Sequence, residues 1–372
     1  MSLFTERPAL RWAAPVGAAA LVAAVALVAG RSASAVPSLP PRTPAQLLAD
    51  VQQARPAGLS GTVVQTSKLG LPELPGVNGF GGGSSSSLSS TVTGTHTWRL
   101  WYAGPTRSRL ALVGSLGESD VIRNGRDLWV WSSTDKSATH ALVPDEVKHA
   151  SAAPPALEPD NLPKTPQDAA RLALAAVDPT TSVTTSGATS VAGRSAYDLL
   201  LRPKDADSLV SQVRISVDAQ EHIPLRVQVY STKAANPAFE VGFTAVSFAK
   251  PEASQFAFNP PPGTTVKQAT LPTPGAGVAT KAPQHSTSPR PTVVGRGWAS
   301  VVVTKLPTQA TSRSASSGQL ARLLRTLPTV SGSWGRGHLL NGTLFSAVLT
   351  DDGRLAIGAV TPQRLYAALA AK

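Results

Sequence analysis

The sequence of 372 residues contains no cysteine. This absence excludes disulfide bonds, thiol nucleophiles and lipid attachment through a cysteine, so stability must come from hydrophobic cores alone. Lysine and arginine outnumber the acidic residues by 34 to 22, but no run of four or more basic residues occurs. Because scattered cations suit a solvated surface rather than a phosphate-binding patch, we expect no nucleic-acid partner.

Motifs of catalysis and metal binding are also missing. The chain has no G-x-S-x-G, H-E-x-x-H, P-loop or EF-hand sequence. Its six histidines are scattered, with none paired at helical or hairpin spacing: His96, His140, His149, His222, His285 and His338. We therefore expect a non-enzymatic protein with no cofactor and no metal. A hydrolase whose site is assembled from residues distant in sequence stays open as an alternative.

The amino terminus is typical of an export signal. Arg7 and Arg11 precede an apolar run from Ala13 to Gly30, and Ala33-Ser34-Ala35 follows with the small residues that a signal peptidase prefers. Residues 1–35 are predicted to be a signal peptide or an uncleaved amino-terminal membrane anchor, since a span needs about 20 apolar residues. In both cases the rest of the chain is exported, into the cell envelope, secreted or anchored.

Residues 43–266 have the pattern of one domain dominated by short strands. Thr43-Pro44 and Thr165-Pro166 each predict a capped helix. Turn residues separate the alternating strand segments, which indicates an antiparallel arrangement of about ten strands. The expected strands are 61–65, 97–102, 107–113, 120–123, 126–132, 195–202, 210–217, 225–230, 239–248 and 256–258.

The segment DVIRNGRDLWVW, from Asp120 to Trp131, predicts a β-hairpin. Asn124 and Gly125 both tolerate positive φ and suit the central positions of a type I′ turn, which would pair Val121 with Leu128. A slip of one residue would send the apolar side chains to the opposite face. The turn therefore decides which side of the sheet is apolar.

Two segments are rich in glycine, serine or proline and interrupt this pattern. The insertion from Leu69 to Ser90 is either a flexible hairpin tip or a lid or partner-binding loop, in which Leu69, Leu71, Leu74 and Phe80 would make the contacts. Residues 267–291 have the composition of a linker. The remaining residues, 292–372, predict a small α+β domain: a strand at 292–305, a helix at 314–327, a hairpin at 339–360 turning at Asp352-Gly353, and a last helix after Thr361-Pro362.

The order of these elements resembles the superfamily of the lipoprotein carriers LolA and LolB and the envelope-stress sensor RseB (MucB). The resemblance covers roughly Thr43 to Val266, and the appended domain makes a two-domain, RseB-like organisation the closer match. It rests on the order of several segments: RLAL, DVIRNGRDLWVW, VAGRSAYDLLLRPKD, VRISVDAQEHIPLRVQV, FEVGFTAVSF and FAFNPPPGTTV. It implies an α+β fold, in which a curved antiparallel half-barrel sheet wraps over helices, with a small carboxy-terminal α+β domain attached.

The resemblance also implies a hydrophobic cavity for the acyl chains of a lipid or lipoprotein. Carried over by register, the cavity face is lined by Leu110, Leu112, Val121, Leu128 and Val130. For each of these residues alone, an ordinary core position is the simpler interpretation. Where LolA has an arginine before a proline that holds its lid shut, this chain has Gly104-Pro105. The resemblance therefore does not extend to LolA's release mechanism, in which Arg107 or Arg109 could substitute only if the geometry differs. The missing cysteine means that the chain is not a lipoprotein like LolB.

Two further interpretations stay open. Trp98, Trp101, Trp129 and Trp131 lie on neighbouring expected strands, where they either pack across strands or stack on a carbohydrate. The chain is either a carrier or sensor of acyl chains, or a regulatory module that binds a membrane protein such as an anti-sigma factor or transporter. We expect a monomer in either case.

Overall fold

The computed structural model describes residues 39–70, 93–114, 117–144, 163–175, 177–270, 291–305 and 324–371. All of the described residues belong to one compact unit, which begins at Leu39. The predicted leader, residues 1–35, lies outside the described residues. Within the described ranges, no helix has both the length and the apolar composition of a membrane span.

The two helices of the main domain begin where the sequence predicts. Helix α2 (Pro44–Gln53) opens with a capping box, in which Thr43 Oγ1 accepts the Gln46 N–H at 3.3 Å and Gln46 Oε1 accepts the Thr43 N–H at 2.9 Å. Helix α3 (Pro166–Ala175) has Thr165 Oγ1 accepting the Asp168 N–H at 3.1 Å. The hydroxyl-proline pairs therefore work as helix starts.

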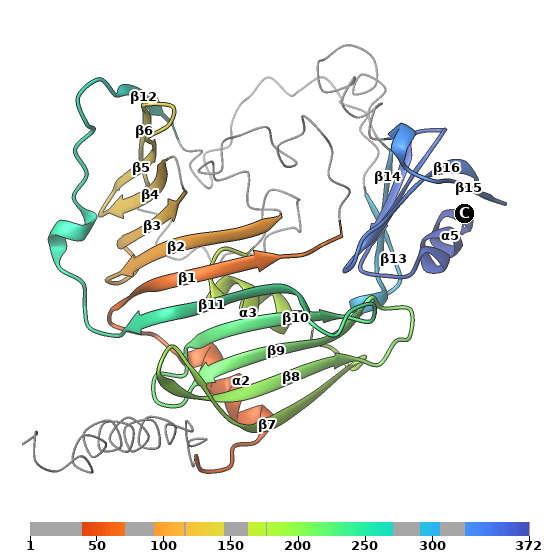
Figure 1. Ribbon diagram of the computed structural model, residues 1–372, viewed down its shortest axis with the longest axis horizontal. Helices are drawn as coiled ribbons and strands as arrows, with labels where there is room; N and C mark the ends of the chain where they lie inside the picture. Colours follow the sequence, from red (N-terminus) through yellow and green to blue (C-terminus); the bar gives the residue numbers. More distant parts are fainter. Residues whose placement is uncertain are drawn as a thin grey trace, which may run out of the picture. The chain divides into compact units, whose positions relative to one another are not determined.

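A twelve-stranded sheet forms the main domain, in the order β12-β6-β5-β4-β3-β2-β1-β11-β10-β9-β8-β7 (Figure 1). Every neighbouring pair is antiparallel except β12 and β6, which run parallel. Because β7 and β12 lie at opposite ends of this order, the curved sheet is not closed. Its strands are β1 (Leu59–Ser67), β2 (Gly94–Tyr102), β3 (Arg107–Val113), β4 (Glu118–Asn124), β5 (Asp127–Ser132), β6 (Ser137–Leu142), β7 (Thr181–Val191), β8 (Arg194–Pro203), β9 (Val210–Asp218), β10 (Pro224–Ser231), β11 (Pro237–Ser247) and β12 (Thr265–Ala269).

Three features of this sheet differ from the sequence-based expectation. Strands β6 and β7 are not predicted, because serine, threonine and alanine dominate both segments. The strand predicted at 256–258 is wrong: a 3-10 helix, η3 (Ala253–Phe256), stands there and buries Phe256 against the sheet. Strand β12 takes in Lys267 to Ala269, the first residues of the predicted linker.

The β4–β5 hairpin exists, but its register is shifted by two residues from the predicted one. Gly125 has a φ of +65°, whereas Asn124 is not left-handed, so the turn residues are Gly125 and Arg126 rather than Asn124 and Gly125. A glycine at the first central position is typical of a type II′ turn. Val121 therefore pairs with Val130, not with Leu128. Since a shift of two preserves the alternation, all three side chains keep a common face.

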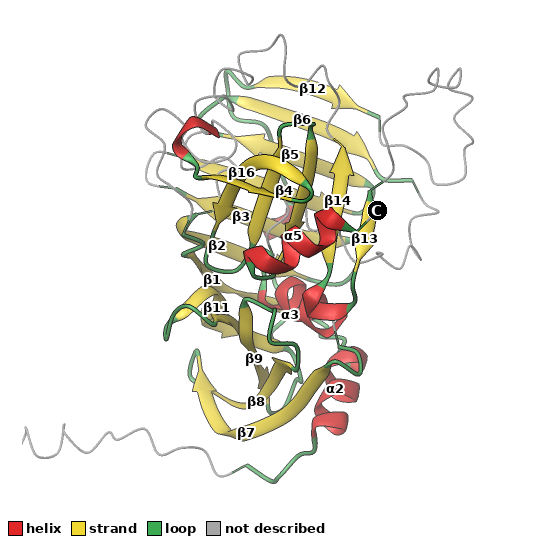
Figure 2. Ribbon diagram, turned by 90° about the vertical axis from the view of Figure 1, so that its right-hand side faces the viewer, coloured by secondary structure: helices red, strands yellow, loops and turns green. Residues whose placement is uncertain are grey.

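The core of the main domain lies on the face of the sheet that carries both helices. The main contacts of α3 are with β10 and β11, and those of α2 are with β7, as both views of the chain indicate (Figures 1 and 2). Leu47 of α2 and Ala170 of α3 join a cluster that extends through Val63 and Trp98 to Leu112. On the opposite face, η3 packs on β3 and β4, where Ile122 is fully buried.

A second sheet of six strands lies in the carboxy-terminal part, in the order β13-β14-β18-β17-β16-β15. The single strand predicted at 292–305 is two strands, separated by the 3-10 helix η4 (Gly297–Ala299). The turn at Asp352-Gly353 and the last helix, α5 (Pro362–Ala370), are confirmed. Most of the helix predicted at 314–327 lies outside the described residues. The strands are β13 (Thr292–Val294), β14 (Val301–Lys305), β15 (Thr329–Gly332), β16 (Gly335–Asn341), β17 (Ser346–Thr350) and β18 (Arg354–Gly358).

Hydrogen bonds from the β16–β17 loop join this part to the main domain. Ser231 Oγ donates to the Thr343 carbonyl at 2.6 Å, and the Thr343 N–H donates to the Leu69 carbonyl at 2.7 Å. Trp298 Nε1 donates to Thr181 Oγ1 at 2.9 Å. Thr343 therefore contacts both the end of β10 and the chain that follows β1.

A candidate apolar binding surface

An apolar row crosses four neighbouring strands on the helix-bearing face of the main sheet. Leu100 of β2 lies opposite Leu110 of β3, Leu110 opposite Val121 of β4, and Val121 opposite Val130 of β5. With adjacent strands about 4.8 Å apart, this apolar row is about 14 Å long. Tyr102 and Leu128 lie on the same face, next to the row.

The apolar row is not part of the closed core. Leu100, Leu110 and Val121 are each half-buried, and Val130 is 39% exposed. Leu100 and Leu110 pack against the edge of the core, whereas Val121 and Val130 do not belong to it. The main helix contacts lie on β7, β10 and β11, away from these strands. The described residues thus leave an apolar surface at β3–β5 beside a filled core.

The structure brings the five predicted cavity residues onto one face but gives them two different environments. Leu110, Val121, Leu128 and Val130 are accessible on the apolar surface, whereas Leu112 is fully buried among core residues. Sequence reasoning did not include Leu100 and Tyr102. The alternation Trp98-Leu100-Tyr102 on β2 could have placed them on this face, because it matches the Leu110-Leu112 alternation on β3.

Of the four predicted lid or partner-loop residues, the structure describes only Leu69. Its side chain is buried and its carbonyl accepts the Thr343 N–H. The neighbouring Gly70 has a φ of +67°. Leu71, Leu74 and Phe80 lie outside the described residues. The first residue of the insertion is thus hydrogen-bonded to Thr343 of the β16–β17 loop.

The four tryptophans near the amino-terminal strands divide between the two faces of the sheet. Trp98 is fully buried in the core, with Nε1 donating to Gln65 Oε1 at 3.3 Å. Trp129 lies on the opposite face, where its ring is 4.3 Å from that of His140 and 5.2 Å from that of Phe258. Arg109 lies over the Trp101 ring at 5.3 Å. These contacts favour cross-strand packing over a carbohydrate platform.

A buried charged cluster lies on that opposite face, next to η3. Asp120 is fully buried, and its Oδ2 accepts a hydrogen bond from Arg109 Nη2 at 2.5 Å, while its Oδ1 has no partner in the described structure. Burial raises the pKa of Asp120 to about 7; the Arg109 charge opposes this shift and Glu118 reinforces it. The folded chain therefore favours the protonated carboxyl more strongly than the unfolded chain does.

This shift predicts a pH dependence of stability. The unfolded carboxyl ionises near 3.8 and the folded one near 7, so its contribution to stability is complete below pH 3.8 and is lost as the pH rises to 7. We expect Asp120→Asn to flatten the free energy of unfolding between pH 4 and 7, measured by chemical denaturation. Asp135→Asn, at an exposed position in the turn between β5 and β6, should keep the wild-type dependence of the unfolding free energy on pH. An unchanged slope in Asp120→Asn would contradict the shift.

Two cavities in the described structure lie away from the apolar row. One, of about 450 Å³, is lined by residues before α2, by the β7–β8 turn and the start of β8, and by the β9–β10 turn. The other, of about 310 Å³, lies between β1, β11 and the β7–β8 turn. None of the five predicted residues lines either cavity. Within the described residues, no three histidine, aspartate or glutamate side chains gather as metal ligands would.

Comparison with known proteins gives one family and several solved structures. The model of a family described as "Predicted periplasmic protein (DUF2092)" matches residues 167–267. No curated protein matches the chain. Similar solved structures include MucB from Pseudomonas aeruginosa in complex with MucA, at 15% identity and a TM-score of 0.40, covering 87% of this chain and 94% of that chain.

Two further solved structures cover less of the chain. An uncharacterized conserved protein from Thermus thermophilus has 10% identity and a TM-score of 0.33, covering 60% of this chain and 98% of that one. A LolA superfamily protein from Nitrosomonas europaea has 10% identity and a TM-score of 0.22, covering 59% of this chain and 99% of that one. The similar structures thus include MucB and a LolA superfamily protein, in agreement with the resemblance indicated by the order of sequence elements.

Proposed function

We propose that this chain is an exported, non-enzymatic binding protein that holds the acyl chains of a lipid or lipoprotein on the apolar row. The observation that carries the proposal is the row itself: Leu100, Leu110, Val121 and Val130 are direct neighbours across four strands, and none of them is fully buried. Contiguous apolar surface of this kind marks binding sites in proteins. The predicted leader and the periplasmic description of the matching family support export.

Burial of hydrocarbon supplies the affinity. Each methylene removed from water contributes about 0.8 kcal/mol, so an acyl tail of about a dozen carbons contributes on the order of 10 kcal/mol before ordering costs. A row of leucine and valine side chains offers no hydrogen bonds that would select a head group. Specificity should therefore depend on chain length and branching, which suits a carrier or a sensor of lipoproteins.

Charge placed on the apolar row should weaken acyl binding strongly. We expect Val121→Arg and Val130→Arg to weaken binding of a fluorescent fatty acid by about tenfold or more, because a guanidinium there would have to be desolvated by the tail. Native mass spectrometry of protein purified without detergent should show lipid on the wild type and none on these variants. Leu112→Arg is unsuitable, since Leu112 is fully buried in the core.

A matched control lies on the other face of the same sheet. Val113 of β3 is 41% exposed, close to the 39% of Val130, and it is paired with Glu118. Val113→Arg should therefore keep acyl binding. Retained lipid in both row variants, or a stoichiometric membrane protein recovered without lipid, would overturn the proposal; the second result would favour the regulatory module instead.

A further inference from the structure

The cavity of about 450 Å³ has an unusual charge distribution. Arg42 and Arg194 both line it, together with Tyr197, Ser195 and Gln220, and no acidic residue does. The apolar part of the lining comes from Leu39, Pro40, Gly193 and Ala219. None of these residues lies on β1–β5, so this arginine cavity is separate from the apolar row. Its volume falls in the range of small-molecule sites.

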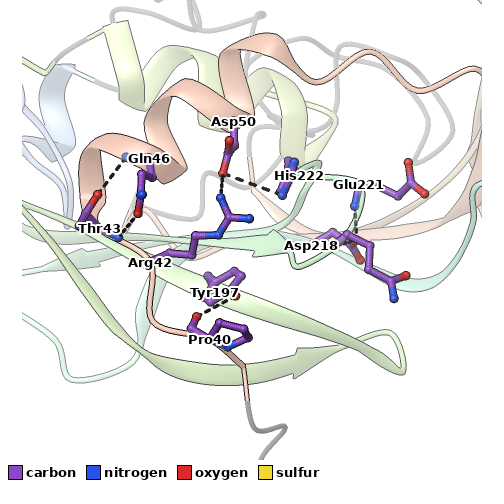
Figure 3. Close-up of polar contacts among 10 residues, drawn as sticks. Pro40, Arg42, Thr43, Gln46, Asp50, Tyr197, Asp218, Glu221 and His222 are labelled. Carbon is purple, nitrogen blue, oxygen red and sulfur yellow. Dashed lines mark hydrogen bonds and ion pairs between the residues drawn. The ribbon is translucent and has the colours of Figure 1, made fainter.

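Both arginines are held in place by carboxylates that do not line the arginine cavity. Arg194 donates Nε to Asp218 Oδ2 and Nη2 to Asp218 Oδ1, the latter at 3.0 Å. Arg42 donates Nη1 to Asp50 Oδ2 at 2.9 Å, and Figure 3 shows its side chain running beneath α2 toward Asp50. A guanidinium fixed by one carboxylate keeps its other N–H groups ready for a second acceptor.

The Asp218 charge is shared among several donors. Its Oδ1 also accepts the N–H groups of Gln220 at 3.0 Å and Glu221 at 2.7 Å. The Asp50 carboxylate lies 3.9 Å from His222 Nε2 as well (Figure 3). Each aspartate therefore has a neighbour besides its arginine, and both arginines line the cavity as protonated cations.

Among the remaining polar groups of the lining, the Gln220 side chain offers hydrogen-bond donors. Gln220 Oε1 already accepts from Arg194 Nη2 at 3.3 Å, which leaves its amide N–H groups available. The Tyr197 hydroxyl donates a hydrogen bond to the Pro40 carbonyl at 2.9 Å. This bond holds the segment before α2 against β8. Among the described residues, the hydrogen bonds of the two arginines use Nε and Nη2 of Arg194 and Nη1 of Arg42. The site thus offers several N–H donors and two cations to a ligand rich in acceptor oxygens.

We propose that the arginine cavity binds a phosphate group, either free as inorganic phosphate or a small phosphate monoester, or as the headgroup of an anionic lipid. Arginine recognises phosphate through paired, charge-assisted hydrogen bonds, and two arginines on one cavity match its several oxygens. The apolar side of the lining accommodates the first carbons of an ester. Arg42 lies in the segment before α2, Arg194 is the first residue of β8, and Gln220 lies in the β9–β10 turn.

Binding is tested on the full exported chain with three probes at matched ionic strength. Inorganic phosphate and glycerol 3-phosphate are titrated by calorimetry, with chloride as the reference anion. Vesicles of phosphatidylcholine with and without phosphatidic acid are tested by flotation. Saturable binding of the soluble phosphates identifies a free phosphate ligand, and binding only to phosphatidic acid vesicles identifies a headgroup. No binding of any probe above the chloride or phosphatidylcholine reference overturns the proposal.

Two variants avoid the buried Arg194–Asp218 pair. Arg42→Gln removes one cation whose side chain is 36% exposed, and it should weaken phosphate binding by about tenfold. Gln220→Glu keeps an acceptor for Arg194 but places a negative charge on the lining, and it should abolish binding. Arg171→Gln removes an exposed arginine of α3 that pairs with Asp168 away from the cavity, and it should bind as the wild type does. Wild-type affinity in both cavity variants would overturn the assignment.

Discussion

Trp98→Ala is expected to lower the free energy of unfolding by about 3–5 kcal/mol, the largest effect of any single side chain in the main domain. Trp98 is the largest fully buried side chain among the described residues, and it lies between Val63 of β1 and Leu112 of β3 on the core face. Its removal leaves a cavity and also takes a hydrogen-bond donor from the buried Gln65 amide. Chemical denaturation monitored by circular dichroism measures the loss.

Trp101, on the same strand but the opposite face, provides the matched control. It is partly exposed and contacts Arg109 through its ring. We expect Trp101→Ala to cost less than about 2 kcal/mol, since a partly exposed ring loses less burial and one cation–π contact. Equal losses in the two variants would show that the core is not centred on Trp98.

Arg194→Ala is expected to destabilise the fold by about 3 kcal/mol at neutral pH, because it leaves the Asp218 carboxylate, 1% exposed, without its cation. Burial alone raises the pKa of Asp218, but the hydrogen bonds from Arg194 and from the backbone of Glu221 and Gln220 outweigh it and hold the pKa below its ordinary value. The stability that this carboxylate contributes is therefore present above pH 3.8 and is lost as the pH falls through the folded-state pKa.

The double variant Arg194→Ala with Asp218→Asn distinguishes two causes of the stability loss: a buried carboxylate left without its cation, and the loss of contacts made by the arginine side chain. The introduced amide oxygen can still accept the backbone N–H groups that Asp218 Oδ1 accepts, and no charge is left buried. We expect the double variant to recover more than half of the loss and to show less change in stability below pH 4 than the wild type. A double variant as unstable as Arg194→Ala would mean that the contact of the Arg194 guanidinium with the Phe248 ring dominates.

The parts of the fold that depend on local chemistry were predictable from the sequence. Thr43-Pro44 and Thr165-Pro166 start helices because a hydroxyl caps the first turn and proline suits it. The alternation in β3, β4 and β5 placed Leu110, Val121, Leu128 and Val130 on a common face, as the structure has them. The predicted face is correct although the predicted turn lies one residue too early, because the resulting shift of two residues in the strand pairing preserves the alternation.

Features that depend on distant contacts were not predictable. Strand β7 is mostly threonine and serine, and it is held in the sheet by pairing with β8 rather than by an apolar pattern. Phe256 has the alternating neighbours of a strand residue, but packing against β3 and β4 favours a 3-10 turn. The arginine cavity brings together Arg42 and Arg194, which are separated in the sequence by helices α2 and α3 and strands β1–β7, and no spacing in the sequence predicts that they are close.

The apolar row runs along the hydrogen-bonding direction of the sheet, across the strands. This orientation determines how the length of the row can change. Each strand contributes one side chain, so lengthening a strand leaves the row as it is, whereas gaining or losing a strand alters it by one step of about 4.8 Å. The apolar row ends at β6, because Thr139, the residue paired with Val130, is polar. Thr139→Val would extend the apolar row by one strand, so the number of strands that contribute an apolar residue sets the length of hydrocarbon that the proposed site could contact.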